Sequence, residues 1–239
     1  MSDIHEWFGR SGPVLKNMSS HWHVIRSAQQ FNEEGRAALM ALVERYYRPI
    51  YRTLLTWEID REEAIELTHR FTADFCDGYV VAMANQDRGQ FRDYLAACLR
   101  NFIRKERRAE KVRRPRPVAE GDLCGRELRP EDGLDRQMAW ETFTQARKQV
   151  EARLGSESVP WRAFHLHDLE PEGRLNKTLA EWGDTFGVST KQFERALYRA
   201  RQVFKEEACR LLADTVATET QLDAEIAWFV RCIHQGPVA

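Results

Sequence analysis

The sequence lacks the features that mark secreted, cysteine-zinc and membrane-spanning proteins. Its five cysteines are scattered, odd in number and without a Cys-x-x-Cys spacing, which argues against a disulfide framework and against a cysteine zinc site. No run approaches the roughly 20 apolar residues that a membrane helix needs. Residues 1–18 mix acidic and basic residues among the apolar ones, unlike a secretory signal. We therefore expect a cytoplasmic protein with no membrane association.

Motifs for catalysis and cofactor binding are equally scarce. The chain has neither a glycine-rich phosphate loop nor a Gly-x-Ser-x-Gly elbow. His21-x-His23 and His165-x-His167-Asp168 could suggest metal ligands, but no cysteine or carboxylate set at a known spacing accompanies them. We expect no catalytic residue, no cofactor and no metal. A metal-dependent hydrolase that uses His165, His167 and Asp168 is the alternative from the enzyme class.

Strand-like alternation is also missing, and apolar residues recur at helical spacing instead. Residues 36–57, 60–77 and 91–103 each carry an apolar stripe at intervals of three and four. Asp60 stands where an N-cap is expected, directly ahead of two glutamates. A hydrophobic content of 43% is ordinary for a protein with a core. We predict an all-α protein in which these three helices share one core.

A segment rich in proline, glycine and charge interrupts the helical pattern at residues 113–134. Such a composition is typical of a flexible linker between two domains. The predicted organisation is an N-terminal extension over 1–35, a first domain over 36–112, the linker over 113–134, a second domain over 135–206 and a C-terminal helical extension over 207–239.

A formal net charge of −1 hides strongly charged segments. Residues 58–78 and 206–225 each carry a net charge of −5, whereas residues 100–116 hold nine basic and two acidic residues, a net charge of +7. Binding to phosphates needs such clustering, because each neutralised phosphate releases counterions. A solvated helix end that leads into the linker is the alternative. The candidate nucleic-acid contacts are Arg100, Asn101, Arg104, Lys105, Arg107 and Arg108.

Residues 178–201 have the pattern of a helix-turn-helix. Thr178 and Glu181 have the spacing of a capping box, Gly183 is small where two helices cross, and Gly187 permits a left-handed turn before Ser189 caps the next helix. The second helix suits a major groove, where Arg and Lys can meet guanine and Gln can meet adenine. An ordinary helical hairpin is the alternative. The residues predicted to contact DNA are Thr190, Lys191, Gln192, Glu194, Arg195 and Arg199.

In their order, these parts resemble the sigma factors of the extracytoplasmic-function (ECF) type. Residues 45–75 resemble the family's polymerase-binding helices, residues 88–108 the helix that recognises and melts the −10 element, and residues 187–201 the −35 recognition helix. Residues 21–28 and 211–233 resemble a branch with a C-terminal extension. The resemblance implies a protein that binds the β′ clamp helices and the β flap of core RNA polymerase and directs it to promoter DNA. A helix-turn-helix regulator without polymerase and a helical adaptor are the alternatives.

The resemblance also implies a polymerase-binding set, which comprises Glu63, Glu66, Leu67, Arg70 and Phe71. The family's usual Asp-Leu-x-Gln-Glu run reads Glu-Leu-Thr-His-Arg here, so Arg70 reverses a charge that faces the partner. Thr68 and Thr72, expected on or beside that face, are candidate phosphorylation sites, because a phosphate could offset Arg70. A Ser/Thr kinase or an anti-sigma factor is accordingly a candidate regulatory partner.

Overall fold

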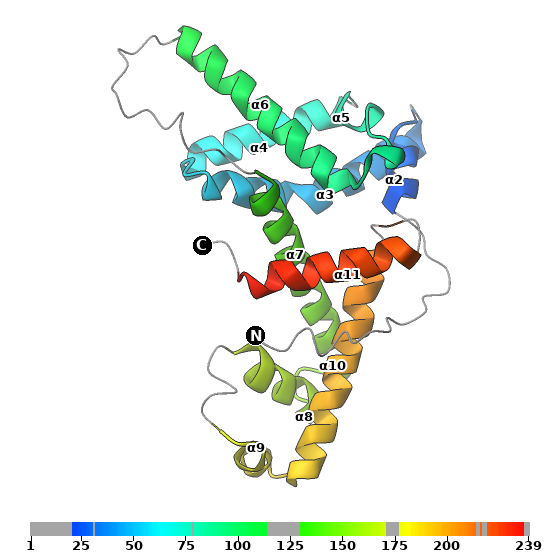
Figure 1. Ribbon diagram of the computed structural model, residues 1–239, viewed down its shortest axis with the longest axis vertical. Coiled ribbons are helices and arrows are strands. Elements are labelled where there is room, and N and C mark those ends of the chain that lie inside the picture. Colours follow the sequence, from blue (N-terminus) through cyan, green and yellow to red (C-terminus); the bar gives the residue numbers. More distant parts are fainter. Residues whose placement is uncertain are drawn as a thin grey trace. The chain divides into compact units, whose positions relative to one another are not determined.

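All regular structure in the described part of the chain is helical (Figure 1). The computed structural model describes residues 21–30, 32–77, 79–113, 130–170, 177–213, 216 and 219–236. The prediction of an all-α protein is therefore confirmed. Within these ranges, no helix combines the length and the apolar character that crossing a membrane would require. The chain divides into two compact units, which we call the N-terminal unit (mainly residues 20–138) and the C-terminal unit (mainly residues 139–236).

The N-terminal unit contains two helices that begin at polar caps. Its elements are α2 (His21–Ala28), α3 (Glu33–Thr56), α4 (Arg61–Cys76), α5 (Tyr79–Ala82), the 3-10 turn η1 (Gln86–Arg88) and α6 (Phe91–Arg113). Asn32 caps α3, where its side chain accepts from the Gly35 N–H at 2.7 Å. Asp60 caps α4 as predicted, accepting from two backbone N–H groups at 2.9 and 3.1 Å. Each cap satisfies donors that the first helical turn would otherwise leave open.

Aromatic rings fill the core of the N-terminal unit. Phe91, at the start of α6, meets Tyr46 at 5.5 Å, Trp22 at 6.1 Å and Phe75 at 6.2 Å between ring centroids, all edge to face. This geometry is the one that the ring quadrupoles favour. One residue of α6 thereby draws α2, α3 and α4 together, as predicted for helices that share one core.

The predicted linker is helical at its C-terminal end. Residues 114–129 lie outside the described residues, but α7 (Pro130–Leu154) already includes residues 130–134. At Gly133 the backbone passes close to α3, because a Cβ there would lie 3.4 Å from Thr53 Cγ2. Arg92 Nε lies 3.4 Å from Asp135 Oδ1. These contacts make the first turns of α7 part of the N-terminal unit, which corrects the expectation that the linker extends to residue 134.

The C-terminal unit is organised around one long helix, α10 (Thr190–Ala213). The rest of α7, α8 (Val159–Ala163), the π-helix η2 (Phe164–Leu169), α9 (Leu179–Phe186) and α11 (Glu219–His234) complete this unit. Phe204 of α10 lies at the centre of the core, 5.2 Å from the ring of Phe143 and 5.6 Å from that of Phe164. The last helix, predicted over residues 219–233, is present as α11.

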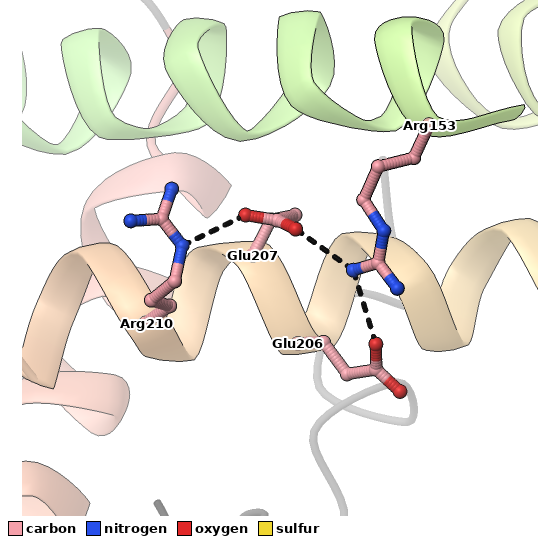
Figure 2. Close-up of polar contacts among 4 residues, drawn as sticks. All are labelled: Arg153, Glu206, Glu207 and Arg210. Atoms are coloured by element: carbon pink, nitrogen blue, oxygen red, sulfur yellow. Dashed lines mark hydrogen bonds and ion pairs between the residues drawn. The ribbon is translucent and has the colours of Figure 1, made fainter. Parts of the chain in front are cut away.

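A network of four charged residues joins the end of α7 to α10 (Figure 2). Arg153 donates to Glu207 at 2.7 Å and to Glu206 at 3.2 Å, and Arg210 donates to the other oxygen of Glu207 at 3.0 Å. Burial of Glu207 favours its neutral form, but the hydrogen bonds from Arg153 and Arg210 outweigh burial and lower the pKa of Glu207. The carboxylate of Glu207 therefore remains ionised although it is buried.

Candidate nucleic-acid interface

The turn between α9 and α10 has the geometry predicted for a helix-turn-helix. Gly187 ends α9 with a φ of 66° and a ψ of 30°, in the left-handed region. The Val188 N–H donates to the Gly183 carbonyl at 2.9 Å, which closes a Schellman-type end. A Cβ at Gly183 would lie 2.8 Å from the Val188 carbonyl oxygen and 3.2 Å from the Thr190 nitrogen. The roles predicted for Gly183 and Gly187 are thus confirmed.

Both helices of the motif begin with a capping box. At α9 the Thr178 N–H donates to Glu181 Oε2 at 2.6 Å, and the Glu181 N–H donates back to Thr178 Oγ1 at 3.3 Å. Hydrogen bonds from Thr178 lower the pKa of Glu181. At α10 the Ser189 N–H donates to Gln192 Oε1 at 2.9 Å, and the Gln192 N–H donates back to Ser189 Oγ at 3.4 Å. These reciprocal bonds fix where each helix starts.

Stacked aromatic rings form the core of the motif. Trp182 of α9 and Phe193 of α10 are nearly parallel, with centroids 6.2 Å apart and an interplanar angle of 4°. Phe186 packs 5.6 Å from Phe193. Lys177 places its ammonium 4.8 Å from the Trp182 centroid, and Arg162 places its guanidinium 5.5 Å from the Phe186 centroid. These cations cover the rings from the solvent side by cation–π contact.

A buried carboxylate holds α10 against the π-helix η2. Asp168 accepts from Arg201 Nε at 2.7 Å and from the second guanidinium nitrogen at 2.8 Å, and its Oδ1 also lies 2.8 Å from His167 Nδ1. Such a bidentate pair is both strong and geometrically specific. Of the residues in the hydrolase alternative, Asp168 is thus bonded to Arg201, and His165 stacks on Trp161 with ring centroids 5.5 Å apart. Within the described ranges, no three ligand-type residues form a metal-binding group.

The outward side of α10 displays the side chains predicted to read DNA. The predicted residues are all exposed, whereas Phe193, Leu197 and Ala200 on the opposite side are buried. Tyr198, also expected on this side of the helix, is 64% exposed. We define the reading face as these exposed side chains of α10: Thr190, Lys191, Gln192, Glu194, Arg195, Tyr198 and Arg199.

An open hollow adjoins the reading face at its C-terminal end. Its walls come from the end of α7 and the middle of α10, and the lining residues are Arg153, Leu154, Tyr198, Arg199, Gln202, Val203 and Glu206. Sequence reasoning missed this hollow, because its two sides are far apart in the chain.

A second basic surface lies on α6 of the N-terminal unit. Leu95, Leu99 and Ile103 bury one side of this helix. The predicted basic residues occupy the other sides: Asn101, Arg104, Lys105, Arg107 and Arg108 are exposed, and Arg100 is half-buried. The structure describes the side chains of α6 as far as Glu110. We call the exposed residues Asn101, Arg104, Lys105, Arg107 and Arg108 the basic face of α6.

Only part of the predicted polymerase-binding set is accessible on α4. Leu67 is 6% and Phe71 is 1% exposed, so these side chains belong to the core and the prediction that they contact a partner is wrong. Glu63 and Glu66 are exposed, as predicted. Arg70 pairs with Glu106 of α6 at 2.5 Å, so an acid of its own unit compensates the reversed charge.

Neither candidate phosphorylation site lies at the surface. Thr68 is 0% and Thr72 is 8% exposed. The Thr68 hydroxyl donates to the Ala64 carbonyl at 2.6 Å, and the Thr72 hydroxyl donates to the Thr68 carbonyl at 2.8 Å. The expectation of threonines on or beside the exposed face is therefore wrong, since a kinase could reach these hydroxyls only after α4 had left its core.

The candidate interface thus has two parts, the reading face of α10 and the basic face of α6, each on its own unit. Acidic residues of α4 accompany the second part, where partial desolvation of the exposed Glu63 carboxyl, together with the nearby carboxylates of Asp60 and Glu110, raises the pKa of Glu63. In comparisons with known families, curated proteins and solved structures, nothing matches this chain.

Proposed function

We propose that the chain is a sigma factor of the ECF type, which binds core RNA polymerase and directs promoter recognition and transcription initiation. One observation carries the proposal. A helix-turn-helix whose two helices each begin with a capping box, and whose exposed reading face carries a net positive charge, occurs in the same chain as a second basic helix that lies beside an acidic one. A helix-turn-helix regulator that acts without polymerase has no need for the second pair of helices, α4 and α6.

In this proposal the reading face of α10 binds the −35 duplex. Lys191 and Arg195 suit guanine edges, and Glu194 suits the amino group of cytosine. Their backbone positions are set by the capping box at Ser189 and by the bond from Arg201 to Asp168. The rigid placement of the helix lets a few side chains discriminate between base pairs.

The basic face of α6 binds the −10 region in this proposal. Arg104 and Arg108 are one helical turn apart, so both can approach one phosphate strand. Capturing an unstacked base costs a few kcal/mol, which contacts on a rigid helix can offset. Phe91 and Phe102 are buried in the core. The proposal therefore assigns this helix a phosphate-binding role.

The exposed acids of α4 contact the polymerase in this proposal. Glu63 and Glu66 supply the negative charge, while Leu67 and Phe71 hold the helix from behind. Arg70 is directed to Glu106, which reduces its repulsion toward a basic partner surface. The polymerase itself supplies all of the chemistry, so no catalytic group is required of this chain.

The test mixes the purified full chain with bacterial core RNA polymerase and a library of promoter fragments. Size-exclusion chromatography detects co-elution with core, and run-off transcription detects initiation. We expect co-elution, selective enrichment of fragments and promoter-dependent transcripts. The double variant Arg104→Ala/Arg108→Ala should yield no promoter-dependent transcripts. Lys148→Ala, which removes an exposed basic side chain from α7, should yield them as the wild-type protein does. DNA binding without core would refute the sigma proposal in favour of a plain regulator, and failure of both would favour an adaptor.

A further inference from the structure

The side-chain amide of Gln192 has its orientation fixed by Ser189. The Ser189 N–H and the Ser189 hydroxyl both lie 2.9 Å from Gln192 Oε1. Because a backbone N–H can only donate, the amide atom that faces it must be the carbonyl oxygen and not the nitrogen. The NH₂ group of Gln192 therefore points away from the cap.

Ser189 also saturates the carbonyl oxygen of Gln192. An amide oxygen has two lone pairs, and the Ser189 N–H and hydroxyl take one each. The side chain of Gln192 is exposed, and among the described residues its NH₂ group has no hydrogen-bond partner. Toward a ligand, Gln192 thus presents two N–H donors and no acceptor.

The hydrogen-bonding pattern of the bases in the major groove makes the lack of an acceptor on Gln192 decisive. A glutamine that specifies adenine must accept from the N6 amino group while it donates to N7. Guanine instead presents two adjacent acceptors, N7 and O6. We infer that Gln192 acts as a donor-only group that selects guanine over adenine, with Ser189 as its positioning residue. The inference rests on the proposed DNA-reading role of α10, and it reverses the adenine preference expected from the residue type.

The neighbours of Gln192 reinforce a guanine preference. Lys191 and Arg195 flank it on the exposed side of α10, and both can only donate hydrogen bonds. Glu194 is the one carboxylate on the reading face and accepts, which suits the cytosine of a G·C pair. The first two turns of α10 are therefore matched to G·C pairs.

The test selects bound duplexes from a randomised library with the full chain in complex with core polymerase. The position of the duplex at which the Gln192→Ala variant loses its base preference identifies the base that Gln192 contacts. We expect the wild-type protein to select guanine there. Ser189→Ala removes the hydroxyl and frees one lone pair, so the adenine-to-guanine ratio should rise about tenfold.

Two further variants separate base reading from helix capping. Thr178→Ala removes the equivalent hydroxyl from the α9 capping box, so it is a matched control for lost stability and should leave the ratio unchanged. Gln192→Glu keeps an acceptor for Ser189 but replaces the NH₂ donor with an oxygen, so it should abolish the guanine preference while α10 stays capped.

The outcomes distinguish the inference from the proposed function. Selection of adenine by the wild-type protein at that base, or an equal shift in the Ser189→Ala and Thr178→Ala variants, would overturn the inference and leave the sigma proposal standing. If the wild-type complex retained no duplex at all, both the inference and the proposed function would be overturned.

Discussion

The close approach of α9 to the turn at Gly183 predicts a large effect from adding one methyl group. In an ordinary helix interior, Gly→Ala stabilises by roughly 0.5–1 kcal/mol. At Gly183 the new Cβ would lie 2.8 Å from the Val188 oxygen, 3.2 Å from the Thr190 nitrogen and 3.3 Å from the Ser189 carbonyl carbon. All three are backbone atoms that the turn holds in place, so the overpacking cost of about 1–3 kcal/mol should exceed the gain. We expect Gly183→Ala to lower the free energy of unfolding of the C-terminal unit by about 1–2 kcal/mol.

The same substitution at Gly133 is the matched control. A Cβ there would make ordinary contacts, 3.4 Å from Thr53 Cγ2 and 3.4 Å from Thr56 Oγ1. Gly133→Ala should therefore be neutral or stabilising, by up to about 1 kcal/mol. Urea denaturation followed by tryptophan fluorescence measures both variants against the wild-type protein. If Gly183→Ala were as stable as the wild-type protein, the argument from the turn geometry would be refuted.

Three further predictions concern buried polar groups. Thr68→Asp should destabilise the N-terminal unit by about 3 kcal/mol or more, because it buries an unpaired charge. Thr68→Val should cost only about 0.5–1.5 kcal/mol, the net contribution of the hydrogen bond that the Thr68 hydroxyl donates to the Ala64 carbonyl. Equal denaturation midpoints for the two variants would contradict the burial of Thr68. Glu207→Gln should cost about 1.5–3 kcal/mol near pH 7, because it removes the charge from the hydrogen bonds that Arg153 and Arg210 donate. The pKa of Glu207 is lowered from 4.5 in the folded protein, so the stability that its carboxylate contributes is complete above pH 4.5 and is lost as the pH falls through the folded pKa. Thermal unfolding from pH 7 to pH 3 should therefore show the melting temperatures of the wild-type protein and the Glu207→Gln variant converging. A constant difference between these melting temperatures would be inconsistent with this linkage. Asp168→Asn should lower the free energy of unfolding by about 2–3 kcal/mol, which is less than the loss of a fully buried pair because the partner, Arg201, is 27% exposed. Urea denaturation measures this loss, and an unchanged midpoint would argue against a stabilising ion pair.

Local signals in the sequence were sufficient to locate the helices and the helix-turn-helix. The helix expected over 36–57 spans 33–56, and the N-cap expected at Asp60 has both predicted hydrogen bonds. The capping box of Thr178 and Glu181 is also present. These features depend on hydrogen bonds between residues that are close in the chain, so their sequence spacing determines them directly.

Burial of polar residues on α4 could not be predicted from the same patterns. Counting apolar positions treats Thr68 and Thr72 as polar, yet their hydroxyls bond within the helix and their methyl groups can then enter the core. The pair between Arg70 and Glu106 joins different helices and depends on how α4 packs against α6. Contacts of this kind follow from tertiary packing, which residue spacing along one helix does not encode.

Gln192 shows another limit of prediction from sequence patterns, because this one residue fits two patterns at once. The Ser-x-x-Gln spacing fits a capping box, and the exposed position fits a base-reading side chain. The sequence favours adenine for such a glutamine only if its oxygen is available. The hydrogen bonds that Ser189 donates to Gln192 Oε1 exclude that assumption, and the structure shows that both of them form.

The start of α7 has a consequence for folding during synthesis. A nascent chain emerges from its N-terminus at about 5–20 residues per second, and units fold as they become complete. Because Gly133 packs on α3 and Asp135 pairs with Arg92, the N-terminal unit lacks part of its packing until residue 138 has left the ribosome. A truncated protein that ends at residue 112 lacks those contacts, whereas one that ends at residue 138 contains them and should fold more stably.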